Sequence, residues 1–188
     1  MSLTQQPSEA EHPEGFSRVP DGFQRLWTPH RMVYIGGHDR PTTSDSEVCP
    51  FCRAPEMPDD EGLIVARGNT VFAVLNLYPY NPGHMLICPY RHVPDYTDLT
   101  EEETGELAVF TQKTMRVARQ VAGPAGFNIG MNQGAVAGAG IAAHLHQHIV
   151  PRWNGDANFL PLIAQTKALP QLHDSVRNAY VQAWNVQA

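Results

Sequence analysis

The 188-residue chain has few cysteines, no excess of positive charge and no long apolar run. Its three cysteines are an odd number, so they cannot form a complete disulfide framework, and we expect a reduced, cytoplasmic protein. No apolar stretch reaches the roughly 18 residues that a membrane-spanning helix needs. The 13 basic and 19 acidic residues give a net charge of -6, which argues against long nucleic acids as partners because their binding depends on phosphate neutralisation. A small phosphorylated ligand needs only a local positive pocket and is still compatible with this composition.

What the chain does contain indicates one globular domain. Apolar residues make up 42% of it and charged residues 17%, an ordinary balance for a folded protein. We expect residues 1–21 to be a flexible leader, because residues 1–16 are rich in Glu, Gln, Ser and Pro and lack a signal-peptide hydrophobic region. Residues 22–188 then form a single domain with a C-terminal helical extension.

Short apolar runs separated by turn residues predict five β-strands. They cover residues 63–66, 71–75, 84–89, 127–132 and 144–150. The first three form an antiparallel meander. A long helix is expected after Thr100, which forms a capping box with Glu103, and Gly123 followed by proline ends it. A second helix is expected over 169–184, so the fold class is α+β, with a mainly antiparallel five-stranded sheet.

Three histidines alternate with other residues in the fifth predicted strand. Because side chains alternate along a strand, His144, His146 and His148 should share one face, with roughly 7 Å between successive rings. Three imidazoles are costly as core filling, since each would need a buried hydrogen-bond partner. Two functions fit this pattern: a metal site, or a nucleophilic imidazole tuned by its neighbours.

Two further segments carry chemical signals. Glycines at positions 130, 134, 138 and 140 would let backbone amides approach an anion closely, which favours phosphate chemistry beside the histidines. Cys49 and Cys52, two residues apart, have the spacing of half a zinc site. Taken alone, this pair would equally suit a redox pair or a disulfide turn.

Together these segments resemble the histidine triad family of nucleotide hydrolases and transferases. The resemblance is carried by the His-Leu-His-Gln-His-Ile-Val run at 144–150, by Asn76 to His84, and by Pro89 to Val93. Downstream, 151–153 and 155–159 are similar to the branch that contains diadenosine tetraphosphate phosphorylases. The resemblance covers the chain from about Arg25 to the C-terminal helix.

The resemblance implies a role for each matching position. His146 would attack the α-phosphate and form a nucleotidyl-histidine intermediate, His148 would bind phosphate oxygens and help protonate the leaving group, and His84 would support them. The implied substrate contacts are Asn76 for the ribose, Asn132, Gly138, Ala139 and Gly140 for phosphate, and Trp153 for the far end of the ligand.

The resemblance also completes the half zinc site. It implies a closed structural zinc site formed by Cys49, Cys52, His92 and His144, which leaves His146 free for catalysis. Magnesium is a further candidate, carried by the nucleotide. A two-fold homodimer is expected, since members of the family commonly pair in this way.

The implied activity is cleavage of a nucleoside 5′-phosphate anhydride. With inorganic phosphate as acceptor, diadenosine tetraphosphate would yield ADP and ATP, and Arg91 and Arg152 are candidates to supply positive charge. The alternatives are hydrolysis of dinucleoside polyphosphates, or of AMP esters and phosphoramidates. Outside enzyme classes, a nucleotide-binding sensor leaves His146 without a purpose, and a zinc-dependent structural module leaves Asn76 and the glycines unexplained.

Overall fold

The computed structural model describes residues 49–156 and 172–187 of the chain. The predicted leader at 1–21 and the first residues of the predicted C-terminal helix, 169–171, lie outside these ranges. The strands are β1 (Ile64–Arg67), β2 (Val71–Leu75), β3 (Met85–Pro89), β4 (Gly126–Met131) and β5 (Gln147–Arg152). The α-helices are α2 (Pro50–Arg53), α3 (Glu101–Ala122) and α5 (His173–Val186), and 3-10 turns cover Ala54–Glu56, Tyr96–Asp98 and Ala135–Ala137.

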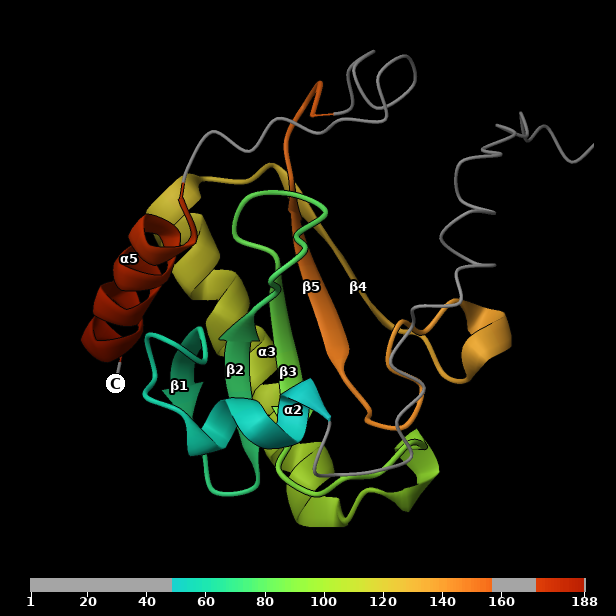
Figure 1. Ribbon diagram of the computed structural model, residues 1–188. Coiled ribbons are helices and arrows are strands. Elements are labelled where there is room, and N and C mark those ends of the chain that lie inside the picture. Colours follow the sequence, from blue (N-terminus) through green and yellow to red (C-terminus); the bar gives the residue numbers. More distant parts are fainter. Residues whose placement is uncertain (1–48, 157–171, 188) are drawn as a thin grey trace, which may run out of the picture.

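The strands form one sheet in the order β1-β2-β3-β5-β4, and every neighbouring pair is antiparallel (Figure 1). The prediction of an α+β fold with a five-stranded antiparallel sheet is therefore confirmed. Every residue of β2 and β3 is buried, so these strands are covered on both faces. Among the described residues, none of the helices combines the length and the apolar character that crossing a bilayer requires.

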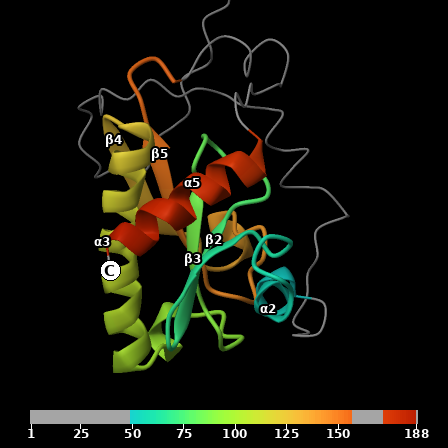
Figure 2. The same ribbon diagram turned by 90° about the vertical axis from the view of Figure 1, so that its left-hand side faces the viewer.

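Helices α3 and α5 cover one face of the sheet, and α2 lies on the other (Figure 2). Side chains of the central strands alternate between the two faces. Ala73 and Leu75 pack into the larger core shared with α3 and α5, whereas Phe72 and Val74 pack into a smaller core that Phe51 of α2 joins. The sheet thus has a hydrophobic core on each of its two faces.

The pairing register places the third histidine of the triad on the α2 face. His148 pairs with Leu86, which belongs to the smaller core, while Ile149 pairs with Met85 in the larger core. The polar site is therefore built on the side of the sheet that carries only a short helix, and the long helix α3 supports the sheet from behind.

Helix α3 begins and ends where the sequence predicts. The Glu103 N–H donates to Thr100 Oγ1 (3.2 Å) and the Thr100 N–H donates to the Glu103 carboxylate (2.8 Å), which completes the capping box. Gly123 ends the helix in the left-handed conformation with φ of 54°, which a residue without Cβ adopts at little cost.

Four of the five predicted strands have different bounds in the structure. β4 lies one residue earlier than the predicted 127–132. β1 begins one residue late because Leu63 has a positive φ of 55°, which no strand accommodates. β3 begins at Met85, after His84. β5 begins at Gln147, so the prediction that His144 and His146 lie within the strand is wrong. The Leu145 N–H donates to Val93 O (2.7 Å) instead of to a neighbouring strand, which leads the chain away from the sheet.

Candidate active site and metal centre

His146 is the histidine whose hydrogen position the structure fixes most directly. Its Nδ1 lies 2.8 Å from the carbonyl oxygen of His144. A carbonyl oxygen only accepts, so Nδ1 carries the hydrogen and Nε2 carries the lone pair. Burial lowers the pKa of His146, and the bond to His144 O opposes this shift only in part, so the ring is neutral at pH 7. The arrangement presents an unprotonated imidazole nitrogen that can act as a nucleophile.

His148 lies beside His146, and its other side contacts His84. The rings of His146 and His148 are 5.0 Å apart at an interplanar angle of 66°, closer than the roughly 7 Å strand repeat because His146 precedes the strand. His84 Nε2 lies 2.9 Å from His148 Nδ1. Burial, with a further contribution from the neighbouring His146, lowers the pKa of His148 to about 4. His148 is therefore uncharged at neutral pH.

Asn76 joins the same group of side chains. The Tyr78 N–H donates to Asn76 Oδ1 (3.0 Å), which orients the amide so that its Nδ2 lies 3.2 Å from His84 Nδ1. Each atom of the Asn76 amide keeps some bonding capacity, one N–H and one lone pair, for a further partner.

Four further side chains, around the first histidine of the triad, come together in an arrangement that could bind a metal. One ligand atom each from Cys49, Cys52, His92 and His144 lies within 4.8 Å of the other three, and the cysteines are free thiols. His144 Nδ1 lies 3.4 Å from both cysteine sulfurs, and His92 Nδ1 lies 3.2 Å from Cys52 Sγ. All four predicted ligands thus come together from three separate segments of the chain.

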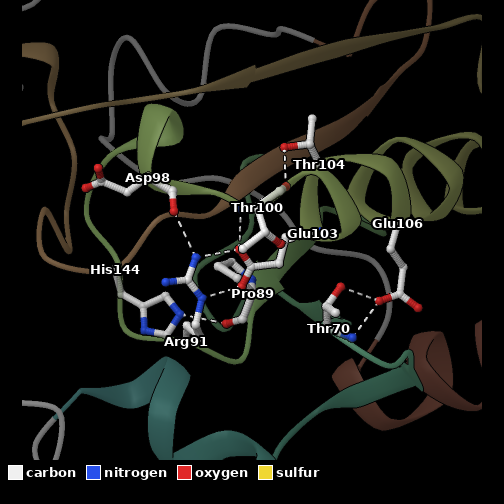
Figure 3. A network of polar contacts seen from close by, with 9 residues as sticks. All are labelled: Thr70, Pro89, Arg91, Asp98, Thr100, Glu103, Thr104, Glu106 and His144. Atoms are coloured by element: carbon white, nitrogen blue, oxygen red, sulfur yellow. Dashed lines mark hydrogen bonds and ion pairs between the residues drawn. The ribbon is translucent and has the colours of Figure 1, made fainter.

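The hydrogen of His144 is also fixed, and on the side away from the thiols. His144 Nε2 donates to the carbonyl oxygen of Pro89 (2.9 Å), an interaction visible in Figure 3. The lone pair of Nδ1 therefore faces Cys49 and Cys52. Histidines that bind a metal usually have this arrangement: one ring nitrogen donates to a backbone carbonyl, and the other keeps its lone pair for the metal.

The segment that carries His92 is attached to helix α3 by a salt bridge. Arg91 donates to both carboxylate oxygens of Glu103 (2.7 and 2.6 Å) and to Asp98 O (2.8 Å), as Figure 3 shows. Glu103 is the capping-box residue, so the start of α3 and the loop before it form one unit.

The predicted phosphate-binding residues lie in the loop between β4 and β5, which leads into His144. Within it, Gly134 and Gly138 adopt positive φ values of 78° and 85°, and Ala139 is buried. Asn132 and Gly140 flank this turn and are partly exposed. The loop is thus at the same end of β5 as His144 and His146.

Three other candidates lie away from the histidines or are already paired. Trp153 follows the far end of β5, where its indole N–H donates to Ala122 O (3.2 Å), so the structure does not bring it near His146 of its own chain. Arg152 makes a bidentate contact with Asp156 (2.6 and 2.8 Å), and Arg91 is paired with Glu103. Both arginines proposed for the acceptor phosphate are therefore neutralised by a carboxylate.

Two aromatic residues at the site were not singled out from the sequence. The Phe51 ring, between the two cysteines, contacts His146 (4.8 Å between centroids) and His144 (5.6 Å). Tyr80 stacks on His148 at 5.8 Å with an interplanar angle of 17°. An aromatic residue inside a Cys-x-x-Cys pair was the available signal for Phe51, since a turn that binds a metal also fixes the side chain it carries.

Comparisons with known proteins agree with this geometry. The HIT domain family model matches residues 58–155. The AP-4-A phosphorylase of Mycobacterium tuberculosis is 50% identical over 167 residues, which cover 87% of this chain and 86% of that protein. The bis(5′-adenosyl)-triphosphatase of Dictyostelium discoideum is 40% identical over 81 residues, which cover 43% of this chain and 54% of that protein.

Solved structures show the same fold. A zinc-bound histidine triad family protein from Mycobacterium smegmatis matches with a TM-score of 0.61 and 25% identity, covering 76% of this chain and 97% of that one. A histidine triad nucleotide-binding protein from Sulfolobus tokodaii matches with the same TM-score, covering 73% and 93%. The family model covers just over half of the chain and one relative is 50% identical over most of it, so the chain belongs to the HIT family.

Proposed function

We propose that this enzyme cleaves diadenosine tetraphosphate by phosphorolysis, giving ADP and ATP, through a nucleotidyl intermediate on His146. The observation that carries the proposal is the hydrogen bond from His146 Nδ1 to His144 O, which leaves a buried, unprotonated Nε2 beside His148. The similarity to an AP-4-A phosphorylase over most of both chains supports the substrate and the acceptor.

The proposed reaction has two displacements at the same phosphorus atom. His146 Nε2 attacks the α-phosphorus, the bond to the bridging oxygen breaks, and ATP leaves with the bonding electron pair. The ring then carries positive charge, which the carbonyl oxygen of His144 stabilises through Nδ1–H. An oxygen of inorganic phosphate next attacks the same phosphorus, the nitrogen–phosphorus bond breaks, and ADP forms.

His148 would assist as a hydrogen-bond donor. With its pKa lowered to about 4 by burial, it is neutral at pH 7 and has no proton to give away completely. A neutral N–H can still stabilise the negative charge that develops on the leaving oxygen. The resemblance implies that His148 binds phosphate oxygens and helps to protonate the leaving group, and we propose this hydrogen bond as the form that its help takes.

The substrate contacts are proposed from position and remaining bonding capacity. Asn76 would bind ribose hydroxyls with its remaining N–H and lone pair. Asn132 and the backbone of Gly138, Ala139 and Gly140 would bind phosphate, because their loop leads to His146, directly before β5. Because the two arginines are paired with carboxylates, backbone amides would provide most of the anion binding.

We assign zinc to the Cys49–Cys52–His92–His144 cluster. With bonds of about 2.3 Å to sulfur and about 2.0–2.1 Å to nitrogen, a tetrahedral zinc ion places sulfur and nitrogen ligands about 3.5 Å apart. The observed separations of 3.2 to 3.4 Å fit this geometry. Zinc would hold the ligand segments together and keep the cysteines as thiolates, which suits a reducing compartment such as the cytoplasm. Magnesium, if used, would arrive with the nucleotide, since this cluster is the only such group among the described residues.

A two-fold homodimer is proposed from the edge of the sheet. β4 is the last strand on one side, and within the described part of the chain no further strand pairs with it. Ile129 in β4 is 45% exposed and Val109 on α3 is 58% exposed. An open edge with exposed apolar side chains is a typical surface for pairing with a second copy.

The covalent intermediate gives the test of the mechanism. Incubation with diadenosine tetraphosphate in the absence of phosphate should add one adenylyl group to the protein, and peptide mass spectrometry should locate it on His146. The His146→Asn variant should carry no adduct and should lose at least about 10³-fold in rate. Activity close to wild type in this variant would contradict the assignment.

A further inference from the structure

The turn between β2 and β3 carries His84, and a buried amide attaches this turn to β5. Asn81 is 4% exposed, and its Nδ2 donates to Pro151 O (2.8 Å) and to Asp156 Oδ2 (2.7 Å). Pro151 belongs to β5, the strand that also carries His148. We propose that Asn81 and Asp156 form a clamp that positions His84 against His148 and thereby directs the His148 N–H toward the leaving nucleotide. This inference deepens the proposed function and rests on it.

The hydrogen positions in the histidine pair follow from one backbone donor. The Tyr80 N–H donates to His84 Nδ1 (3.0 Å), so that nitrogen accepts and cannot carry a hydrogen itself. The hydrogen of His84 is then on Nε2, which donates to His148 Nδ1 (2.9 Å). With its Nδ1 accepting, His148 carries its own hydrogen on Nε2.

His148 Nε2 is the atom that this chain of hydrogen bonds leaves available. It is buried, and among the described residues it has no hydrogen-bond partner. Buried polar atoms in folded proteins almost always find a partner, so an orphan N–H beside the His146 nucleophile is where a ligand oxygen would bind. A donor at this position would stabilise charge on the oxygen that leaves phosphorus.

The clamp attaches the turn to β5 and to the segment that follows this strand. Asp156 is held by two contacts with Arg152 and by the Trp153 N–H (3.2 Å), so it offers Asn81 a fixed acceptor. Asn81 and His84 thus attach the turn to β5 at two points. Without Asn81, the turn would keep the hydrogen bond between His84 and His148 and the stacking of Tyr80 on His148, but it would lose both Asn81 bonds to β5 and Asp156. His148 could then exchange its hydrogen between the two nitrogens.

The test uses aryl esters of AMP whose phenols differ in pKa, with phenol release followed in a single turnover. A hydrogen bond to the leaving oxygen matters most for the most basic phenols, so Asn81→Ala should slow these esters by about 10- to 100-fold and the most reactive ester by less than about 3-fold. The matched control is Asn128→Ala, which removes an amide that accepts from Arg152 (Nη1 to Oδ1, 2.6 Å), the residue that also holds Asp156, but leaves the bonds of the turn intact. It should retain the wild-type dependence on phenol pKa.

An equal slowing of all esters by Asn81→Ala would overturn the proposal, because it would indicate general damage. If the wild type released no phenol and formed no adduct on His146, the proposed function would fail instead. A second measurement is independent of turnover: imidazole ¹⁵N spectra of the zinc-loaded protein should show His148 protonated on Nε2 in the wild type and on a mixture of both nitrogens in Asn81→Ala. Identical His148 spectra in the two proteins would exclude the clamp.

Discussion

At the scale of single residues, the reactivity of this site depends on hydrogen positions that the backbone imposes. Carbonyl oxygens of His144 and Pro89 accept from His146 and His144, and in each ring this leaves the opposite nitrogen with its lone pair. For His146 that nitrogen is free for phosphorus, and for His144 it faces two thiols. In the proposed mechanism, two histidines of one motif would thus acquire different functions, nucleophile and metal ligand, from the partner of one ring nitrogen.

Zinc content tests the division of roles within the triad. We expect His144→Ala to reduce the zinc bound by the purified protein well below one ion per chain, because a tetrahedral site loses one of its four ligands. His146→Ala serves as the control and should retain its zinc, since His146 is absent from the cluster. Metal analysis by mass spectrometry measures both, and unchanged zinc in His144→Ala would exclude that residue as a ligand.

The salt bridge of Glu103 predicts a pH dependence of stability. Hydrogen bonds from Arg91, opposed in part by burial, lower the pKa of Glu103 from an ordinary value of 4.5 to about 2. A carboxylate with a lowered pKa stabilises the fold fully above the pKa of the unfolded chain, and this contribution is lost as the pH falls from about 4.5 to about 2.

Glu103→Gln should therefore lower the free energy of unfolding by about 1–2 kcal/mol at neutral pH. The value is modest because the Arg91 side chain is 50% exposed and water screens the pair. Urea unfolding of wild type and variant should show this difference shrinking by more than half at about pH 3. A difference that stayed constant down to that pH would contradict the assigned cause.

At the scale of elements, helix α3 supports the sheet through a second carboxylate. Glu106 accepts hydrogen bonds from three consecutive N–H groups of the β1–β2 turn, those of Asn69, Thr70 and Val71 (2.6 to 3.1 Å), and from the Thr70 hydroxyl, a contact drawn in Figure 3. A Cβ on Gly68 would lie 2.5 Å from the Glu106 carboxylate, so a side chain at this position would displace the carboxylate from these donors.

Replacement of Glu106 should destabilise the fold as a whole. We expect Glu106→Gln to lower the free energy of unfolding by about 1–3 kcal/mol, since an amide can accept fewer of these bonds and places its own N–H groups against donors. Glu102→Gln, on the exposed side of the same helix, should change it by less than about 0.5 kcal/mol. Equal effects of the two substitutions in urea unfolding would contradict the role assigned to Glu106.

Elements that depend on local chemistry were predictable from the sequence, and those that depend on distant partners were not. The capping box at Thr100 and the left-handed Gly123 involve neighbours within a few residues, and both ends of α3 agree with the prediction. The start of β5 does not, because Leu145 bonds to Val93, a residue from another segment. The strand propensity of residues 144–150 does not predict that contact.

The same distinction applies to the site. Side chains to which we assign a chemical role, such as Cys49 and His146, are visible as motifs, whereas the partners that orient them are not. From the sequence, Arg91 is a candidate cation for phosphate, whereas in the fold it pairs with Glu103. Asn81 and Asp156 are far apart along the chain, and only the antiparallel return of β5 brings them together.

At the scale of the whole molecule, the open edge at β4 predicts a dimer. Sedimentation at micromolar concentration should give about twice the chain mass of 20.8 kDa. Ile129→Lys should shift the protein to a monomer, because a charge on an edge strand opposes pairing. Val186→Lys, which alters a 76% exposed apolar residue on α5, should remain dimeric. A wild-type monomer, or dimers of all three proteins, would contradict this interface.

The fate of labelled inorganic phosphate tests the proposed reaction most directly. Diadenosine tetraphosphate would be incubated with the zinc-loaded enzyme and ³²P-labelled inorganic phosphate, and the nucleotides separated. Nucleotidyl transfer from His146 to phosphate predicts label in the β-phosphate of ADP, an equal amount of unlabelled ATP, and no turnover when phosphate is omitted. AMP as the product, with all label remaining in inorganic phosphate, would show that water is the acceptor and would contradict phosphorolysis.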